Sequence, residues 1–296
     1  MQVSLASRRV FLLVIFSLGW LTAPIGWAHD VYLKPTSYET ETGQETEVIV
    51  FDGSFAESVY AITTGSVSEL QVADAGGTSS IDTSSWDSVE KKSPLWKLAR
   101  KRSGTLSGTN LKLTSSFKYS PDKPGSHVLG LSLYEFRVAM NLEDFVTYLE
   151  EEAGQTLDLE ALGFTEPDDV IRERFTKTAK TIINVDGEVS SHALEPMGLL
   201  VEIVPLEHPA TTEVGQSLSF RLFEEGEPLT DHPVIIGRKG DSDLHLVLLS
   251  DDKGIVTLPI TATDVWWLKL IRIQPAPEDD PMDFYSRWAS LTFEID

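Results

Sequence analysis

The chain has 296 residues, with 46 acidic and 24 basic side chains, a formal net charge of −22 and no cysteine. Such a negative surface disfavours nucleic acid and anionic lipid as partners and favours cations. The absence of cysteine excludes disulfide bonds, thiolate metal sites and cysteine nucleophiles.

The first 28 residues have the pattern of a secretory signal peptide. Two arginines precede the apolar run 10–21, and the small residues Gly26 and Ala28 stand three and one places before the expected cut. We therefore expect removal of residues 1–28, a periplasmic or otherwise exported protein, and a mature chain that begins with His29. The alternative is an uncleaved anchor, but the run is short for a bilayer of ~30 Å and no later segment is apolar enough to span one.

Short alternating or β-branched runs recur from end to end of the mature sequence, separated by turns rich in Gly, Pro and Asp. This spacing favours antiparallel sandwiches over βαβ units. We expect a mainly β fold with two antiparallel, immunoglobulin-like β-sandwich domains at 29–190 and 197–296, separated by the polar segment 186–196. The predicted strands are 46–51, 127–136, 199–206, 217–223, 234–237, 245–249, 255–260, 266–273 and 288–295.

A helical insertion is predicted in the first domain, at about 141–183. Asn141 is a good N-cap, and the apolar residues that follow it fall on one stripe before Gly154. A second helix is expected to begin near Thr165, with Pro167 in its first turn and acidic side chains around it. Its expected buried face consists of Val170, Ile171, Phe175, Thr178 and Ile182.

Two charged segments have both a binding interpretation and a simpler one. The basic cluster 91–102 has a composition that suits docking to a partner or to lipid head groups, whereas a solvated loop face is the simpler explanation. The acidic loop 278–283 has carboxylates for a hard cation such as Ca²⁺, but it lacks the ligand spacing and turn glycine of a calcium loop.

The mature N-terminal histidine is the strongest candidate for metal chemistry. Its α-amine, with a reference pKa near 8, and its ring Nδ1, with a reference pKa near 6.5, can close a chelate around one ion. Cu(II) and Ni(II) suit such nitrogen donors. One more imidazole would complete the site, and we take His29 and His127 as the candidate metal ligands, although a structural role in a strand is the simpler interpretation of His127. The other histidines are His192, His208, His232 and His245, and no pair among them has the spacing of a preformed ligand motif.

Catalytic motifs are not found. The sequence has no glycine-rich phosphate loop, no Gly-x-Ser-x-Gly elbow and no His-Glu-x-x-His pattern. A carboxylate pair for glycoside hydrolysis cannot be picked out from 46 acids. We expect the protein not to be an enzyme.

The segment His29-Asp30-Val31-Tyr32-Leu33-Lys34-Pro35 resembles the His-x-x-Trp-Leu-x-Pro opening of the DUF4198 family, with Tyr32 in place of tryptophan. The resemblance implies a periplasmic component of a nickel or cobalt uptake system. It departs at Ile271-Arg272-Ile273, where many relatives have a histidine and this chain offers a guanidinium that does not bind metals. Further matches follow in order at 124–130, 145–149, 172–180, 200–206, 226–229, 250–254 and 289–294.

The resemblance therefore predicts an exported metal-binding accessory protein for a divalent transition metal. Nickel or cobalt is the metal that the resemblance implies, and copper is a further candidate from the donor chemistry of His29. Its expected partners are membrane transporter subunits. The alternative is a non-catalytic structural or adhesion-type β-sandwich protein that binds protein or polysaccharide and in which His29 has no metal role.

Overall fold

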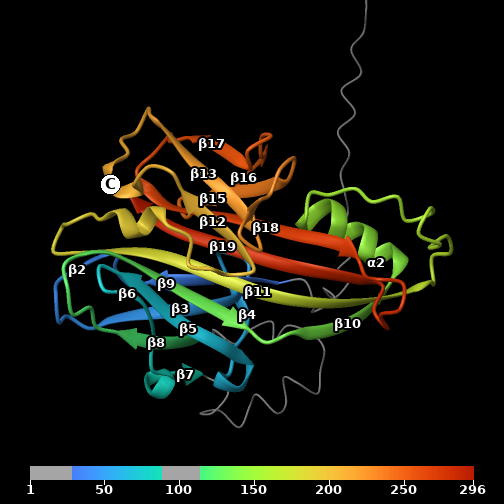
Figure 1. Ribbon diagram of the computed structural model, residues 1–296, viewed down its shortest axis with the longest axis horizontal. Helices are drawn as coiled ribbons and strands as arrows, with labels where there is room; N and C mark the ends of the chain where they lie inside the picture. The colour runs from blue at the N-terminus through green and yellow to red at the C-terminus, as the bar shows by residue number, and fades with distance from the viewer. Residues whose placement is uncertain (1–28, 89–113) are drawn as a thin grey trace, which may run out of the picture.

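The computed structural model describes residues 29–88 and 114–296, without the side chains of 242–245. These residues form three β-sheets stacked as layers (Figure 1). The mainly β, sandwich-type fold is therefore confirmed. The predicted signal peptide 1–28 and the basic cluster 91–102 lie outside the described residues.

The central layer is a ten-stranded sheet, and the other two layers have five and four strands. The five-stranded sheet contains β1 (Asp30–Pro35), β3 (Thr46–Gly53), β4 (Ser58–Tyr60), β7 (Asp87–Ser88) and β8 (Ser115–Tyr119). The four-stranded sheet contains β12 (Val201–Pro205), β13 (Ser217–Glu224), β14 (Glu227–Pro228) and β17 (Ile255–Pro259).

The central sheet runs in the order β16-β15-β18-β19-β11-β9-β5-β6, with β10 and β2 also paired to β11. Its strands are β16 (Asp241–Leu249), β15 (Pro233–Arg238), β18 (Asp264–Pro275), β19 (Phe284–Ile295), β11 (Val170–Val185), β9 (Gly125–Leu133), β5 (Val67–Asp74), β6 (Gly77–Ser80), β10 (Phe136–Asn141) and β2 (Glu39–Thr40). The helical elements are α2 (Leu142–Thr147), a π-turn (Tyr148–Glu152) and short 3-10 turns at Thr64–Ser66, Thr83–Ser85, Ser191–Leu194 and Pro209–Thr211.

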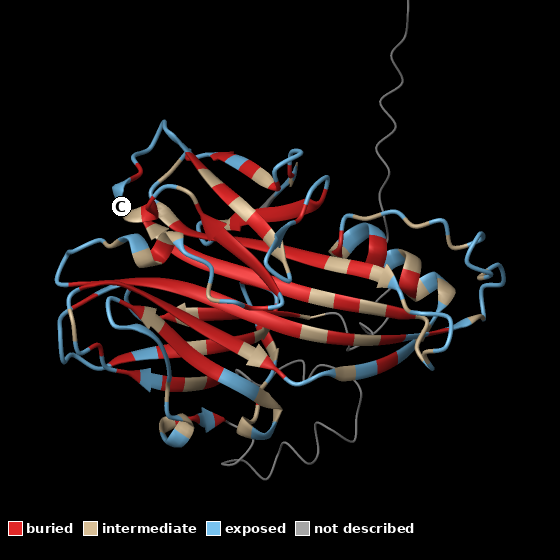
Figure 2. Cartoon of the chain, in the orientation of Figure 1, coloured by how far each residue is buried: buried red, intermediate tan, exposed pale blue. Residues whose placement is uncertain are grey.

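Both faces of the central sheet are covered, so neighbouring residues on one strand enter different cores. Ile183 of β11 and Leu129 of β9 pack toward the five-stranded sheet. Ile182 and Val128, the next residues along the same strands, pack toward the four-stranded sheet. Figure 2 shows the central strands buried along most of their length. The protein is thus two sandwiches that share one middle layer.

The predicted second helix is wrong, because the segment from Val170 to Val185 is the 16-residue strand β11. The helical interpretation assumed one buried stripe. In the structure, residues Thr178 to Val185 are buried on both sides, since β11 lies in the middle of a doubly covered sheet. The β-branched residues of this segment also fit a pleated, packed surface better than a helix.

The first part of the predicted insertion is helical, as expected. Asn141 caps α2, because its side-chain oxygen accepts a hydrogen bond from the backbone N–H of Asp144 at 2.8 Å. The π-turn follows, and Gly154 leaves it with a φ of +61°, a left-handed conformation that favours glycine.

The predicted domain boundary at 186–196 does not divide the sheets. β11 precedes this segment and β19 follows it, yet the two strands pair in parallel, with Lys177 opposite Trp288. The two halves of the chain therefore build one continuous sheet instead of two separate ones.

Strand β1 crosses over this junction and is held there by hydroxyl groups of β19. β1 pairs with β3 along one edge. On the other edge, Ser290 donates a hydrogen bond to the carbonyl oxygen of Val31, and Thr292 donates to that of Leu33 at 2.6 Å. These contacts satisfy buried backbone acceptors that no strand reaches.

We expect Thr292→Val to destabilise the protein by about 1–3 kcal/mol, because it leaves the buried carbonyl of Leu33 without a donor while the shape of the side chain is kept. Chemical denaturation measures the change. Thr257→Val on the exposed face of β17 is the matched control, since water replaces its hydroxyl contact. Equal stabilities of the two variants would contradict this role for Thr292.

Candidate functional site

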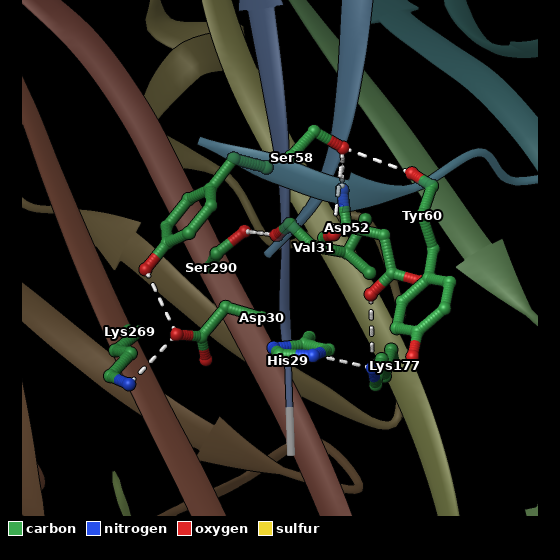
Figure 3. A network of polar contacts seen from close by, with 10 residues as sticks. His29, Asp30, Val31, Asp52, Ser58, Tyr60, Lys177, Lys269 and Ser290 are labelled. Carbon is green, nitrogen blue, oxygen red and sulfur yellow. Dashed lines mark hydrogen bonds and ion pairs between the residues drawn. The ribbon is translucent and has the colours of Figure 1, made fainter. Parts of the chain in front are cut away.

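His29 lies directly before β1, above the junction of β11, β18 and β19 (Figure 3). Its carbonyl oxygen accepts a hydrogen bond from Lys177 Nζ, and its ring lies 5.5 Å from that of Tyr60, tilted by 47°. Within the described residues, no hydrogen bond engages either ring nitrogen of His29. The backbone at this position is therefore fixed while the imidazole stays available.

The surroundings keep the His29 ring uncharged at neutral pH. Burial lowers the pKa of the His29 imidazole below 6.5, and the ammonium of Lys177 lowers it further. The carboxylates of Asp52, Asp30 and Glu152 act in the opposite direction but do not overcome the burial. A neutral imidazole has the free lone pair that a metal ligand requires.

A buried lysine of β18 anchors the first residue of β1. Lys269 is 7% exposed, and its Nζ lies 2.7 Å from Asp30 Oδ2 and 2.7 Å from Glu152 Oε2. Burial lowers the pKa of Lys269, but these two carboxylates outweigh it and leave the pKa above its ordinary value. Burial raises the pKa of Asp30 above its ordinary value, and the ammonium of Lys269 offsets this only in part. Tyr32 also donates to Asp30, so β1, β18 and the π-turn meet at this ion pair.

A second buried lysine, Lys177 of β11, lies on the other side of β1. Its Nζ contacts Asp52 Oδ1 at 3.4 Å and lies over the rings of Trp288 and Phe175, at 5.1 and 5.4 Å from their centroids. This cation–π arrangement compensates part of the desolvation of the ammonium.

Under Lys177 lies a buried carboxyl, Glu173, which is 2% exposed. It accepts hydrogen bonds from Tyr148 at 3.0 Å and from Ser286, and the indole of Trp288 donates to the same serine at 3.0 Å. Burial raises the pKa of Glu173. Because Tyr148 belongs to the π-turn, this network ties the helical cover to the sheet below His29.

The structure does not bring His127 to His29. His127 pairs with Ile183, six residues beyond Lys177 on β11, which is about 20 Å along the strand. Its Nε2 lies 3.0 Å from the carbonyl oxygen of Lys123 and therefore carries the proton, while its Nδ1 accepts from Tyr119 at 2.5 Å. With both nitrogens engaged and no exposed surface, His127 has the geometry of a structural histidine and not of a metal ligand.

His208 joins Ser126 and Asn184 in a cluster that no sequence motif predicts. The Nδ1 of His208 accepts from the backbone N–H of Ala210 at 3.1 Å, so its Nε2 carries the proton and lies 2.6 Å from Ser126 Oγ. Ser126 in turn donates to Asn184 at 3.2 Å. Since His208 donates to the serine, it cannot act as its general base, and the cluster has a structural role.

The remaining candidates do not extend the site. His192 contacts Ser190 at 3.3 Å, and His232 is 2% exposed. In the acidic loop, Asp280 pairs with Arg174 at 2.8 Å and Asp283 accepts from the backbone of Arg172, so both carboxylates are already used. Across residues 29–88 and 114–296, no group of three or more His, Asp or Glu side chains is arranged to hold a metal ion.

We expect acid to destabilise the protein between about pH 6.5 and 4. Burial, aided by the charge of Arg272, lowers the pKa of His232 to about 4 in the folded state. The neutral ring therefore contributes its stability above pH 6.5, and this contribution, about 3 kcal/mol, is lost as the pH falls toward 4. Denaturation at several pH values should show a smaller loss for His232→Gln than for the wild type. The control variant His192→Gln should lose as much stability as the wild type between pH 6.5 and 4. If His232→Gln lost as much stability as this control, the role given to His232 would be contradicted.

We expect Lys269→Met to destabilise the protein by about 3–5 kcal/mol, because Asp30 would remain buried without its partner. Lys118→Met is the matched control, since this lysine is exposed in its pair with Glu45 and its loss should cause no measurable change. Denaturation at pH 7 compares the two variants. If Lys269→Met unfolded at the same denaturant concentration as the control, the anchoring role of Lys269 would be refuted.

In the described part of the chain, none of the helices is long and apolar enough to cross a membrane.

No curated protein matches the sequence. Solved structures similar to the chain include the "D0-D1 domain of Intimin" (11% identity, 89% of this chain and 97% of that chain, TM-score 0.18). Murine CEACAM1b (7%, 90% and 99%, TM-score 0.20) and the human OSCAR ligand-binding domain (10%, 87% and 95%, TM-score 0.18) are also similar. At such low TM-scores these likenesses carry no argument about function.

The sequence also matches one family model, described as "Domain of unknown function (DUF4198)", over residues 26–274. This match covers most of the chain and confirms the resemblance seen at His29 to Pro35. The chain belongs to the DUF4198 family.

Proposed function

We propose that the protein is an exported, non-enzymatic metal-binding accessory to a membrane transporter of a divalent transition metal. Removal of residues 1–28 would turn the backbone nitrogen of His29 into a primary amine. That amine and the ring Nδ1 of His29 would then form the chelate that captures the ion. The observation that carries this proposal is the His29 imidazole, which is neutral and has no hydrogen-bond partner in the described residues.

The fold around His29 supports such a chelate by fixing it in place. β1 starts at Asp30, so only one residue would precede the first strand after cleavage. Asp30 is paired with Lys269, and the carbonyl oxygen of His29 is bound by Lys177. A donor pair that is already rigid loses little conformational entropy when it binds an ion.

The charge near His29 also favours a cation. Three acids, Asp52, Asp30 and Glu152, act electrostatically on the ring, whereas two ammonium groups, those of Lys177 and Lys269, lie among them. Asp52 keeps 19% of its side chain exposed, so it is accessible to an incoming ion. We assign these acids an attracting role and leave the two nitrogens of His29 as the ligands.

The donor chemistry predicts an order of affinities. Nitrogen donors without thiolates bind Cu(II) more tightly than Ni(II), and Ni(II) more tightly than Co(II). Selection of nickel or cobalt for transport would then depend on the supply of metal and on the transporter subunits rather than on intrinsic affinity.

The test is a Cu(II) and Ni(II) titration of protein that begins at His29, beside a variant with one additional alanine before His29. The alanine converts the amine back into an amide but leaves the ring unchanged. Loss of a group that only contacts a metal ligand typically lowers metal affinity by ~10–100-fold. Because the amine would bind the metal directly, we expect its loss to lower the affinity by at least this much. Affinity should also decline below about pH 8, as the amine takes up a proton, and more steeply at lower pH, where the ring does so as well.

His192→Ala serves as the control, because this half-buried histidine lies away from the chain start and should not affect the titration. Equal affinity of the His29-start protein and the alanine-extended variant would refute the chelate. The remaining interpretation would then be the structural or adhesion-type β-sandwich protein.

A further inference from the structure

Two of the sheet edges in the described residues are protected against pairing with a further strand. The outer edge of β1 is covered by the hydroxyls of Ser290 and Thr292. At one end of the central sheet, β6 has only four residues, Gly77 to Ser80, and carries no large apolar side chain. Short edges and covered edges prevent unwanted strand pairing.

The opposite end of the central sheet is β16, which is neither short nor paired along its outer side within the described residues. This strand has nine residues and pairs only with β15 among the described residues. Its sequence contains neither lysine nor proline, the residues that commonly block a free edge. Near its end, Leu246, Val247 and Leu249 are 37%, 51% and 68% exposed.

This gathering of exposed apolar side chains differs from the rest of the described surface. Leu246 and Val247 are neighbours and point to opposite faces of the strand, so both faces are open beside the free edge. The other exposed large apolar residues are spread along the chain: Tyr60, Tyr134, Leu162, Val170, Val189, Leu200 and Val214.

Acidic residues surround the apolar end of β16. Asp231 hydrogen bonds to Ser250, directly after the strand, and Asp251 and Asp252 follow with one lysine behind them. On the other side, Gly154 lies next to Pro233 and Val247, at the end of the π-turn with its exposed acids at 150–151. An apolar strand edge within an acidic border fits an apolar segment with basic flanks.

We propose that β16 binds an extended segment of another protein, which adds to the central sheet as a further strand. Backbone hydrogen bonds would supply the affinity, the apolar side chains of the segment would cover Leu246, Val247 and Leu249, and its basic flanks would meet the acidic border. A second copy of this chain fits less well, because it has the same acidic border and a net charge of −22. This surface is independent of the metal chelate proposed at His29.

The probe is a synthetic nine-residue peptide of alternating valine and threonine, matched to the length of β16 and extended by two lysines at each end. Binding is measured by fluorescence anisotropy, and the site is mapped by hydrogen exchange of the backbone amides. We expect micromolar affinity and slower exchange in residues 241–249. Replacing the lysines of the peptide by glutamates should weaken binding about tenfold, a difference of about 1.4 kcal/mol.

The decisive variant is Val247→Glu, compared with Val214→Glu on an exposed turn. Both variants add the same charge, which alone would strengthen binding of a basic peptide. The proposal expects Val247→Glu to weaken binding at least tenfold and Val214→Glu to leave it within about twofold. No binding, equal effects of the two variants, or protection outside 241–249 would overturn it. Sedimentation that shows self-association abolished by Val247→Glu would also overturn it, because the occupant would be a second copy.

Discussion

The parallel pairing of β11 with β19 fixes the positions of all the groups around His29. It joins the two halves of the chain in one sheet and places Lys177 beside Trp288. β18 pairs with β19 on the far side and sets Lys269 opposite Ser290, the residue that holds β1 in place. A shift of one residue in either register would turn these side chains to the other face of the sheet. The site therefore depends on residues that lie far apart in the sequence.

This arrangement buries three lysines in the sheet, and each of them is paired with a carboxylate. Lys177 and Lys269 face β1, whereas Lys180 points to the opposite layer and pairs with Glu202 at 2.9 Å. Buried ion pairs often add little net stability compared with apolar residues of the same size, but removal of one partner is costly. We therefore expect their role to be specificity, since a change in the register of β1, β12 or the π-turn would separate the paired charges.

Much of the fold could be predicted from the sequence, and the failures have physical causes. Alternating runs such as 46–51 and 217–223 became strands, and Asn141 caps a helix as its side chain predicts. β11 was missed because its doubly buried residues include positions that match a helical stripe. A single-face criterion cannot recognise a strand that is covered on both sides. Because β11 was expected to be a helix, its pairing with β19 across the segment 186–196 was not predicted either.

The candidate site was predictable only in part, for a related reason. The expected cleavage pattern singles out His29, but the two lysines beside it, Lys177 and Lys269, lie on strands more than a hundred residues away. His127 was a reasonable second ligand from composition, yet its hydrogen bonds to Tyr119 and Lys123 depend on tertiary contacts. The proposed chelate therefore depends on a backbone amine that only removal of residues 1–28 would create.

The most direct measurement is the structure of the processed protein, starting at His29, determined with Cu(II) bound. The account predicts the ion at the new chain start, bound by the His29 amine nitrogen and by Nδ1 of the same residue, with Asp30 still paired to Lys269. An ion bound elsewhere, or a His29 that contacts no metal while the protein is saturated, would contradict it.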